Sequence, residues 1–374
     1  MDNDTRLLYE PTTSTHPGET IVEYLEFNSW SQRDLARRTG LTPKTISEIC
    51  NGKAPVTPQT SLALENVFHR PAHFWLNLQR QFDEAEARQR AVSKHAEWQD
   101  WAARFPLKEL KRFGWLGEGG KHSDADALLS FFGVSSPDSW QAVWKASDVA
   151  YRQTRKFSTT VEAVSAWVRE TEIAAAEVEL EVEVKEFDEV RLRSSLDELR
   201  HQTRKGSDEG LSEAQALCAV AGVIVVLVRE LPNTRISGCA RWLTDKKALI
   251  ALTLRYKSAD QIWFTFFHEI AHILLHRKKH SFILDNAAKE LTDKVVDPQM
   301  QRNEEEANRF AADTLVPPET LFHFIKNGNF SSDAIHGIAD ELGIGPGIVV
   351  GRLQHDRLLK PHEGTRLKQY FVGG

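Results

Sequence analysis

The sequence contains few cysteines and no long apolar run. Its three cysteines, Cys50, Cys218 and Cys239, form no Cys-x-x-Cys pair, which excludes a disulfide scaffold and a cysteine-based zinc site. No uncharged apolar stretch approaches ~18 residues, so no transmembrane span is expected. The N-terminus lacks a basic segment followed by an apolar one, so no signal peptide is expected. These absences predict a soluble cytoplasmic protein without a membrane partner.

Neither sign of charge dominates, and the composition is that of a globular protein. The 374 residues carry 47 Lys and Arg against 53 Asp and Glu, a net charge of −6. This excludes a uniformly basic nucleic-acid binder, although it allows a local basic face. Hydrophobic residues make up 41% and charged residues 27% of the chain, which excludes collagen-like, coiled-coil and wholly disordered chains. At ~150 residues per domain, the length predicts two or three domains.

Apolar periodicity predicts a mainly helical chain with a small amount of strand. Two β-branched runs, 222–228 and 248–254, predict strands. Residues 177–184 alternate acidic and aliphatic side chains, which predicts a further strand, with a solvated helix edge as the alternative. Helical spacing predicts later helices over 260–276, 303–315 and, as a pair, 332–354.

The segment 31–53 has the signals of two short helices joined by a tight turn. Ser31 can cap the first helix together with Asp34, and Gly40 supplies the left-handed residue that ends it. Thr42 can cap the second helix, with a proline at the next position. This spacing is typical of a helix-turn-helix, whose second helix enters the major groove of DNA. The alternative is a plain helical hairpin with a solvated face.

This segment is basic although the whole chain is acidic. It has five basic and two acidic residues, a balance of +3. Basic side chains on the flanks would contact phosphates, and polar side chains of the second helix would reach base edges. The predicted DNA-contacting residues are Gln32, Arg33, Thr42, Lys44, Thr45, Ser47 and Lys53.

Residues 17–90 resemble the Cro/repressor helix-turn-helix family and, within it, the HigA-type antitoxins. The matching residues are Pro17-Gly18-Glu19, the helix-turn-helix segment itself and the run Phe-Trp-Leu-Asn-Leu-Gln at 74–79. The resemblance implies a five-helix domain that binds a double-stranded DNA operator. It also implies a homodimer on a palindromic operator.

A second motif, His268-Glu269-x-x-His272, lies in an almost wholly apolar stretch. Two histidines four residues apart lie on one face of a helix and can chelate zinc. Glu269 beside them could act as the general base toward an activated water. Because buried imidazoles need a partner, a metal site is favoured over a chance match.

A third protein ligand is expected from outside this helix. His276 lies about 12 Å along the axis from His268, too far to share one zinc with bonds of ~2.1 Å. It suits a supporting position, or that of a cation at the helix C-terminus. Glu304 opens a later helix and is the preferred ligand, with Glu306 left open. Asn308, one turn on, would orient a metal ligand through a hydrogen bond.

Together these motifs resemble the ImmA/IrrE family of metallopeptidases over about residues 190–330. The match includes the His-Glu-x-x-His block, the block Glu-x-Glu-Ala-Asn-x-Phe-Ala at 304–311 and Leu-Val-Pro at 315–317. The resemblance implies a bound Zn²⁺ ion and cleavage of repressor-like proteins in stress responses or in the control of mobile elements. The zinc ligands that it implies are His268, His272 and Glu304.

The surroundings of the motif leave several roles open. We expect the strand over 248–254 to pair with an extended substrate by edge addition. Trp242 and Trp263 could line the substrate groove, with packing in the core as the favoured alternative. Three side chains stay open as donors to a developing oxyanion: Arg241, Arg255 and His280.

The C-terminal part repeats the helix-turn-helix pattern in degenerate form. Ala, Gly and Pro recur in 338–346 at the same spacing as in 35–43. The helix that would read DNA is aliphatic and carries Arg352 as its charge, so it lacks phosphate and base contacts. We predict a structural bundle packed on the peptidase, or a docking surface, rather than a second DNA-binding site.

These patterns predict an α+β, multidomain protein with two rival functions. Its predicted parts are a flexible tail (1–18), a helix-turn-helix domain (19–90), a helical region with six tryptophans (91–185), a zincin-like α/β peptidase domain (186–330) and degenerate helix-turn-helix-like helices with a tail (331–374). The first function is a DNA-binding regulator that is also a zinc endopeptidase, with a regulatory protein or toxin partner as substrate. The second is an antitoxin-like autorepressor whose peptidase fold is a non-catalytic sensor or partner platform. Self-cleavage near 81–90 is a third possibility.

Overall fold

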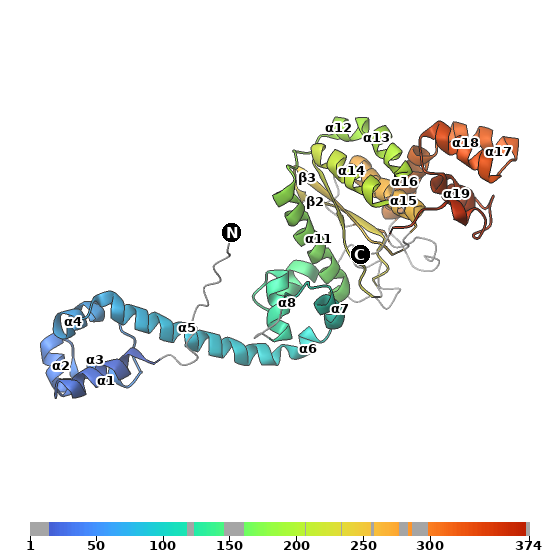
Figure 1. Cartoon of the computed structure of the whole chain (residues 1–374). Coiled ribbons are helices and arrows are strands. Elements are labelled where there is room, and N and C mark those ends of the chain that lie inside the picture. The colour runs from blue at the N-terminus through green and yellow to red at the C-terminus, as the bar shows by residue number, and fades with distance from the viewer. Residues whose placement is uncertain are drawn as a thin grey trace. The chain divides into compact units, whose positions relative to one another are not determined.

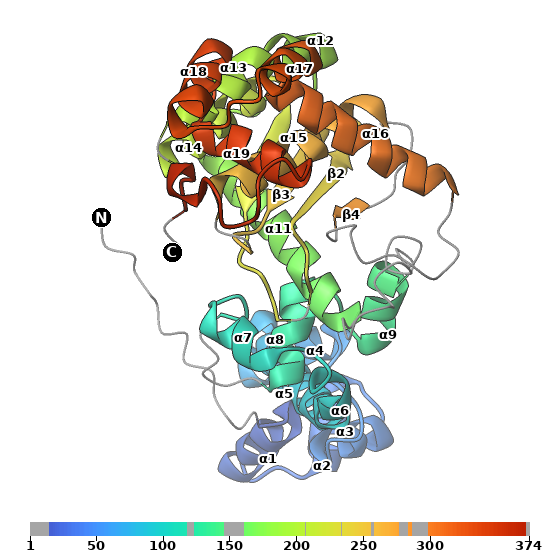
Figure 2. The same ribbon diagram turned by 90° about the vertical axis from the view of Figure 1, so that its right-hand side faces the viewer.

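The chain forms two compact units, Met1–Gln99 and Asp100–Gly374 (Figures 1 and 2). The computed structural model describes residues 15–117, 123–145, 161–205, 207–232, 234–255, 258–276, 283–285 and 298–371. The units are mostly helical, with one small sheet in the second, so the predicted α+β, multidomain class is confirmed. Among the described residues, no helix is long and apolar enough to cross a membrane.

The described part of the first unit, from residue 15 onward, contains five helices and includes the predicted helix-turn-helix. Its helices are α1 (Pro17–Phe27), α2 (Gln32–Thr39), α3 (Pro43–Cys50), α4 (Pro58–Phe68) and α5 (Ala72–Glu97). Ser31 and Asp34 form the predicted capping box, and Gly40 ends α2 with a left-handed φ of 72°. The Thr42 hydroxyl accepts a hydrogen bond from the Thr45 backbone N–H and caps α3.

The N-terminal end of α1 packs closely on the C-terminal end of α3. A Cβ on Gly18 would lie 2.0 Å from the carbonyl oxygen of Ile49, so this approach requires glycine. The ring nitrogen Nδ1 of His16 accepts a hydrogen bond from the Gly18 N–H at 2.9 Å. Pro17 and Gly18 are buried and therefore belong to the folded unit, whereas the predicted tail extended to residue 18.

Most of the tryptophan-rich region lies in the second unit, and its described elements are helical. Its elements are α6 (Gln99–Ala102), α7 (Leu107–Arg112), α8 (Asp124–Phe132), α9 (Pro137–Trp140), the π-helical turn η1 (Gln141–Lys145) and α11 (Val161–Glu181). Trp101, Phe105 and Trp140 are buried, with ring centroids 5.1–6.0 Å apart. Helix α11 packs against strand β1 (Val223–Leu227), so this region belongs to the same compact unit as the sheet.

The prediction of a strand over residues 177–184 is wrong. The alternative, a solvated helix edge, is confirmed as far as Glu181, where α11 ends. The aliphatic residues of this stretch are not buried as a strand face would be, because Leu180 is 88% exposed and Val182 44% exposed. Glu179 of the same stretch forms an ion pair with Lys247 of the sheet. Period-two alternation here reflects a charged helix surface.

The sheet has four described strands in the order β1-β3-β2-β4, with β2 (Gly238–Thr244), β3 (Lys247–Leu252) and β4 (Ile283–Asp285). Strand β1 pairs parallel with β3, and β2 pairs antiparallel with both β3 and β4. The two predicted strands are confirmed. Strand β2 was not predicted, because Gly-Cys-Ala-Arg-Trp-Leu-Thr contains no β-branched run.

Strand β3 lies inside the sheet, and this overturns one prediction. Its residues pair with β1 on one side, as Val223 with Ala248, and with β2 on the other, as Ala240 with Ile250. Both hydrogen-bonding edges of β3 are therefore occupied, so it cannot receive an extended substrate by edge addition.

The other described elements of the second unit are helices and short 3₁₀ turns. They are α12 (Glu189–Ser194), α13 (Leu196–His201), the 3₁₀ turn η3 (Gln202–Arg204), α14 (Ser207–Val220), α15 (Ala259–Leu275), α16 (Pro298–Leu315), α17 (Pro318–Asn327), α18 (Ser332–Leu342), α19 (Pro346–His355) and the 3₁₀ turn η5 (Thr365–Leu367). Helix α14 packs on β1, and α15 packs on β2, β3 and α16. Figures 1 and 2 show α14 and α15 together beside the strands.

The C-terminal helix pair α18 and α19 has the predicted turn but no exposed reading helix. Gly343 ends α18 with a left-handed φ of 67°. Val349, Val350 and Leu353 of α19 are fully buried, and α19 packs on α15. A helix buried in this way cannot enter a DNA groove, which agrees with the structural role predicted from its composition.

The buried leucine of α19 generates a stability prediction. We expect Leu353→Ala to lower the free energy of unfolding of the second unit by about 2–5 kcal/mol, because it leaves a cavity in the core. The control is Leu180→Ala on α11, where the side chain is 88% exposed and a change within about 0.5 kcal/mol is expected. Urea unfolding of the full chain measures both, and equal effects would contradict the buried position of α19.

Candidate metal centre

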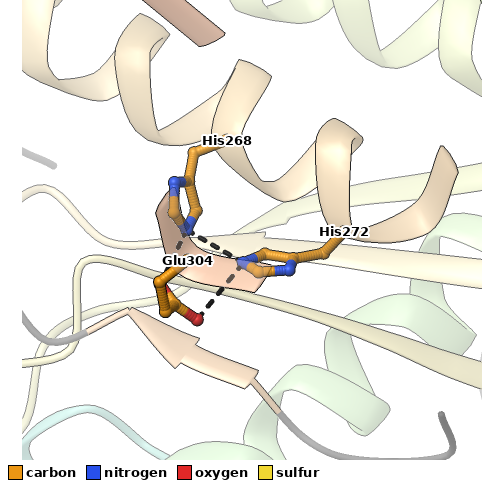
Figure 3. Close-up of side chains that lie close together, drawn as sticks. All are labelled: His268, His272 and Glu304. Atoms are coloured by element: carbon orange, nitrogen blue, oxygen red, sulfur yellow. Dashed lines mark hydrogen bonds and ion pairs between the residues drawn. The ribbon is translucent and has the colours of Figure 1, made fainter. Parts of the chain in front are cut away.

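Helix α15 carries the histidine pair into the interior of the second unit. His268, Glu269 and His272 are 1%, 0% and 4% exposed. Apolar residues on either side, including Phe267 and Ile270, are fully buried in the core. Residues four apart lie on one face of a helix, so the two imidazoles project together from α15, as Figure 3 shows.

Helix α16 brings a carboxylate to this histidine pair (Figure 3). The Nε2 atoms of His268 and His272 are 2.9 Å apart. The Glu304 carboxylate oxygens lie 3.4 Å from His268 Nε2 and 3.6 Å from His272 Nε2. Bonds of ~2.1 Å at tetrahedral angles place ligand atoms about 3.4 Å apart. Two imidazole nitrogens and a carboxylate suit a zinc ion in chemistry. The two nitrogen–oxygen distances match the expected spacing, and the two nitrogens lie closer together than that spacing.

A second set of contacts is made to the Nδ1 atoms of His268 and His272, on the side of each ring away from Nε2. Asn308 Oδ1 lies 3.1 Å from Nδ1 of His268. His276 Nδ1 lies 3.1 Å from Nδ1 of His272, and its Nε2 lies 3.0 Å from Oε2 of Glu306. Of the two glutamates left open by the sequence, the structure thus places Glu304 beside the histidine pair and Glu306 beside His276.

These contacts select the tautomers that leave Nε2 available to a metal. With a metal on Nε2, each ligand imidazole carries its proton on Nδ1. His268 then donates to Asn308, and His272 donates to His276. Burial lowers the pKa of His272 to about 2, with further lowering by His268 and His276. The ring is therefore neutral at physiological pH, as a metal ligand must be.

The other residues considered for this site lie elsewhere or outside the described residues. The Arg241 guanidinium pairs with Glu172 of α11 at 2.7 Å, and Arg255 donates to the carbonyl oxygen of Arg235. These contacts assign neither arginine to the metal centre, and His280 lies outside the described residues. Trp263 is 1% exposed within the core, as favoured. Trp242 packs its ring on Phe187 at 4.9 Å.

The predicted DNA-contacting residues lie on α2, at the N-cap of α3, on α3 itself and in the turn that follows it. Arg33, Thr42, Lys44 and Lys53 are exposed, and Gln32, Thr45 and Ser47 are partly exposed. The Lys44 ammonium lies 3.8 Å from the Glu48 carboxylate, a weak surface contact that DNA phosphates could replace. The hydroxyls of Thr42 and Thr45 are 2.9 Å apart, so part of their hydrogen-bonding capacity serves the helix cap.

Comparisons with known families agree with the two motifs. Residues 23–75 match the helix-turn-helix family, and residues 224–354 match the IrrE N-terminal-like domain. The first unit belongs to the helix-turn-helix regulators, and the second carries an IrrE N-terminal-like domain. The IrrE-like match extends through α18 and α19, so the buried helix pair is part of that domain.

Two curated relatives match part of this chain. The uncharacterized HTH-type transcriptional regulator YddM of Escherichia coli (strain K12) is 38% identical over 71 residues, which are 19% of this chain and 76% of that protein. Virulence-associated protein I of Dichelobacter nodosus is 36% identical over 69 residues, 18% of this chain and 64% of that protein. The chain thus spans slightly under two thirds of the second relative.

Solved structures also match part of this chain. A HigA-family addiction module antidote protein from Coxiella burnetii has 32% sequence identity and a TM-score of 0.22, covering 22% of this chain and 92% of that chain. The antitoxin GraA has 32% identity and a TM-score of 0.20, covering 21% of this chain and 84% of its own.

Three adjacent glutamates on α16 allow a matched test of the metal centre. We expect Glu304→Gln to weaken Zn²⁺ binding by more than about 100-fold, because it removes a ligand charge. Glu306→Gln should weaken it about tenfold, since it disturbs the support of His272 through His276. Glu305 is exposed and bonded to Gln301, so Glu305→Gln should bind zinc like the wild type. Titration against a competing chelator measures all three, and any other ranking would contradict this geometry.

Proposed function

We propose that the chain is a DNA-binding regulator whose second unit is a zinc-dependent endopeptidase acting on a regulatory protein or a toxin partner. The observation that carries the proposal is the convergence of the His268 and His272 Nε2 atoms, 2.9 Å apart, with the Glu304 carboxylate, whose Oε2 lies 3.4 Å from the first and whose Oε1 lies 3.6 Å from the second. Three protein ligands leave one tetrahedral position for water or substrate, which is the pattern of catalytic rather than structural zinc. The match to the IrrE N-terminal-like domain supports it.

The chemistry divides between the metal and the residues of α15 and α16. Zinc, when bound, would polarise the scissile carbonyl group and activate a water molecule. Glu269 would take the proton of the attacking water on its carboxylate and pass it to the leaving amine. Asn308 and His276 would hold the two ligand imidazoles in the required tautomer and orientation.

The first unit would bring this activity to an operator. Lys44, Thr45 and Ser47 of α3 would face the major groove, and Arg33 and Lys53 would contact phosphates. The helix-turn-helix match supports DNA binding by this unit. We further propose a homodimer on a palindromic operator, located on the nucleoid in the cytoplasm.

The general base can be tested separately from the metal ligands. We expect Glu269→Gln to retain stoichiometric zinc and to reduce cleavage of a protein substrate by about 10²- to 10⁴-fold, because proton transfer is lost. Candidate substrates are the proteins encoded beside this chain, assayed by mass spectrometry with Glu305→Gln as the surface control. Retained cleavage would overturn the mechanism. Zinc binding without any proteolysis by the wild type would favour the rival function, an autorepressor with a non-catalytic platform.

The recognition helix can be tested on operator DNA. An operator would first be selected from random-sequence duplexes with the full chain. We expect Lys44→Ala combined with Thr45→Ala to weaken DNA binding about tenfold or more. The slope of log affinity against log salt concentration should also decrease by about one, because one phosphate contact is lost. Lys326→Ala on the exposed surface of α17 is the matched control and should leave the affinity unchanged. Unchanged affinity in the double variant would remove α3 from the interface.

A further inference from the structure

We infer that Gly238, the first residue of β2, is a positioning residue that fixes the Glu269 carboxylate by leaving no room for a side chain at that point of the strand. The inference rests on the proposed role of Glu269. It concerns a different element from the ligands, because β2 contributes none of the three ligand atoms.

Gly238 lies opposite the face of α15 that carries the side chain of Glu269. A Cβ on Gly238 would lie 2.8 Å from Oε1 and 3.2 Å from Cγ of Glu269, and 2.5 Å from Cγ2 of Thr265. Real Cβ atoms essentially never lie closer than about 3.0 Å to another heavy atom, so the Thr265 methyl group and the Glu269 Oε1 atom would both have to shift. Thr265 and Glu269 are four residues apart, so both project from one face of α15 toward β2. The backbone of Gly238 is therefore in contact with the side chain of Glu269.

Conformational freedom does not explain a glycine at this position. Gly238 is not among the residues with positive φ, so its backbone conformation is open to other amino acids. It is also held in the sheet from both sides, opposite Leu252 of β3 and Asp285 of β4. The strand thus cannot move away from α15 without loss of pairing, and space is the remaining reason for glycine.

The flexible part of this contact is the carboxylate. Thr265 is β-branched and stiff in a helix, whereas Glu269 has three side-chain torsions. A side chain at 238 would therefore displace the Glu269 carboxylate first. Burial raises the pKa of the neighbouring Cys239 thiol, and the charge of Glu269 raises it further. Strand β2 thus forms the wall against which the fully buried Glu269 side chain rests.

The test uses the full chain loaded with Co²⁺, whose visible spectrum reports the metal site, and acetohydroxamate as the probe. A hydroxamate that binds the metal also forms a charge-assisted hydrogen bond with a correctly placed carboxylate. The main variant is Gly238→Ala combined with Thr265→Ser, which removes the Cγ2 methyl group and leaves the conflict with Glu269. Thr265→Ser alone is one control. Gly337→Ala on α18 is the other, since nothing in the described structure lies within 4 Å of a Cβ placed there.

We expect the double variant to bind Co²⁺ with wild-type stoichiometry and spectrum but to bind acetohydroxamate about tenfold more weakly, as Glu269→Gln does. Both controls should match the wild type. Wild-type affinity in the double variant, alongside weakened affinity in Glu269→Gln, would overturn the role of Gly238. If the double variant binds acetohydroxamate more weakly and the wild-type chain cleaves no protein, the positioning role of Gly238 would be supported and the proposed peptidase activity would be contradicted. An unaffected Glu269→Gln would overturn the placement of Glu269 itself, and the inference with it.

Discussion

The packing of α16 along α15 is the contact on which the metal centre depends. Two ligands come from one helix, and the third must reach within about 3.4 Å of them from another. Ala307 and Ala311 on α16 are fully buried, and small side chains there let the two helices approach closely. The same contact sets Asn308 against His268 and Glu306 against His276. One helix–helix interface thus supplies one ligand, Glu304, and the hydrogen bonds that orient the other two ligands, His268 and His272.

Burial of the histidine pair has a cost that these contacts offset. An imidazole removed from water loses hydrogen bonds unless the protein replaces them. In this chain Asn308 serves His268, and the series His272, His276 and Glu306 leads from the interior to a carboxylate that is 57% exposed. Burial also keeps His272 neutral. Burial of the imidazoles therefore lowers the stability of the fold, and the same burial keeps their nitrogens neutral and suitable for a metal.

The two helix-turn-helix patterns show how side-chain composition separates a binding surface from a core element. Both have a left-handed glycine before the second helix, Gly40 and Gly343, and a proline at its first turn. Helix α3 presents Lys44 to solvent, whereas α19 buries Val349 and Leu353 against α15. The backbone signal specifies only the turn. Whether the second helix reads DNA or completes a domain depends on whether its outer face is polar or aliphatic.

Local signals in the sequence determined the helix caps, the left-handed glycines, both β-branched strands and the spacing of His268 and His272, because each depends on residues within a few positions. Helical spacing with Asn308, one turn on, favoured Glu304 as the third ligand, but the sequence left Glu306 open. Tertiary structure alone decided that residues 177–184 are largely helical, that β3 is enclosed by β1 and β2, and that Gly238 faces Glu269. Those outcomes depend on which surface each segment buries and which strand lies beside it, and such contacts join residues that are far apart in the chain.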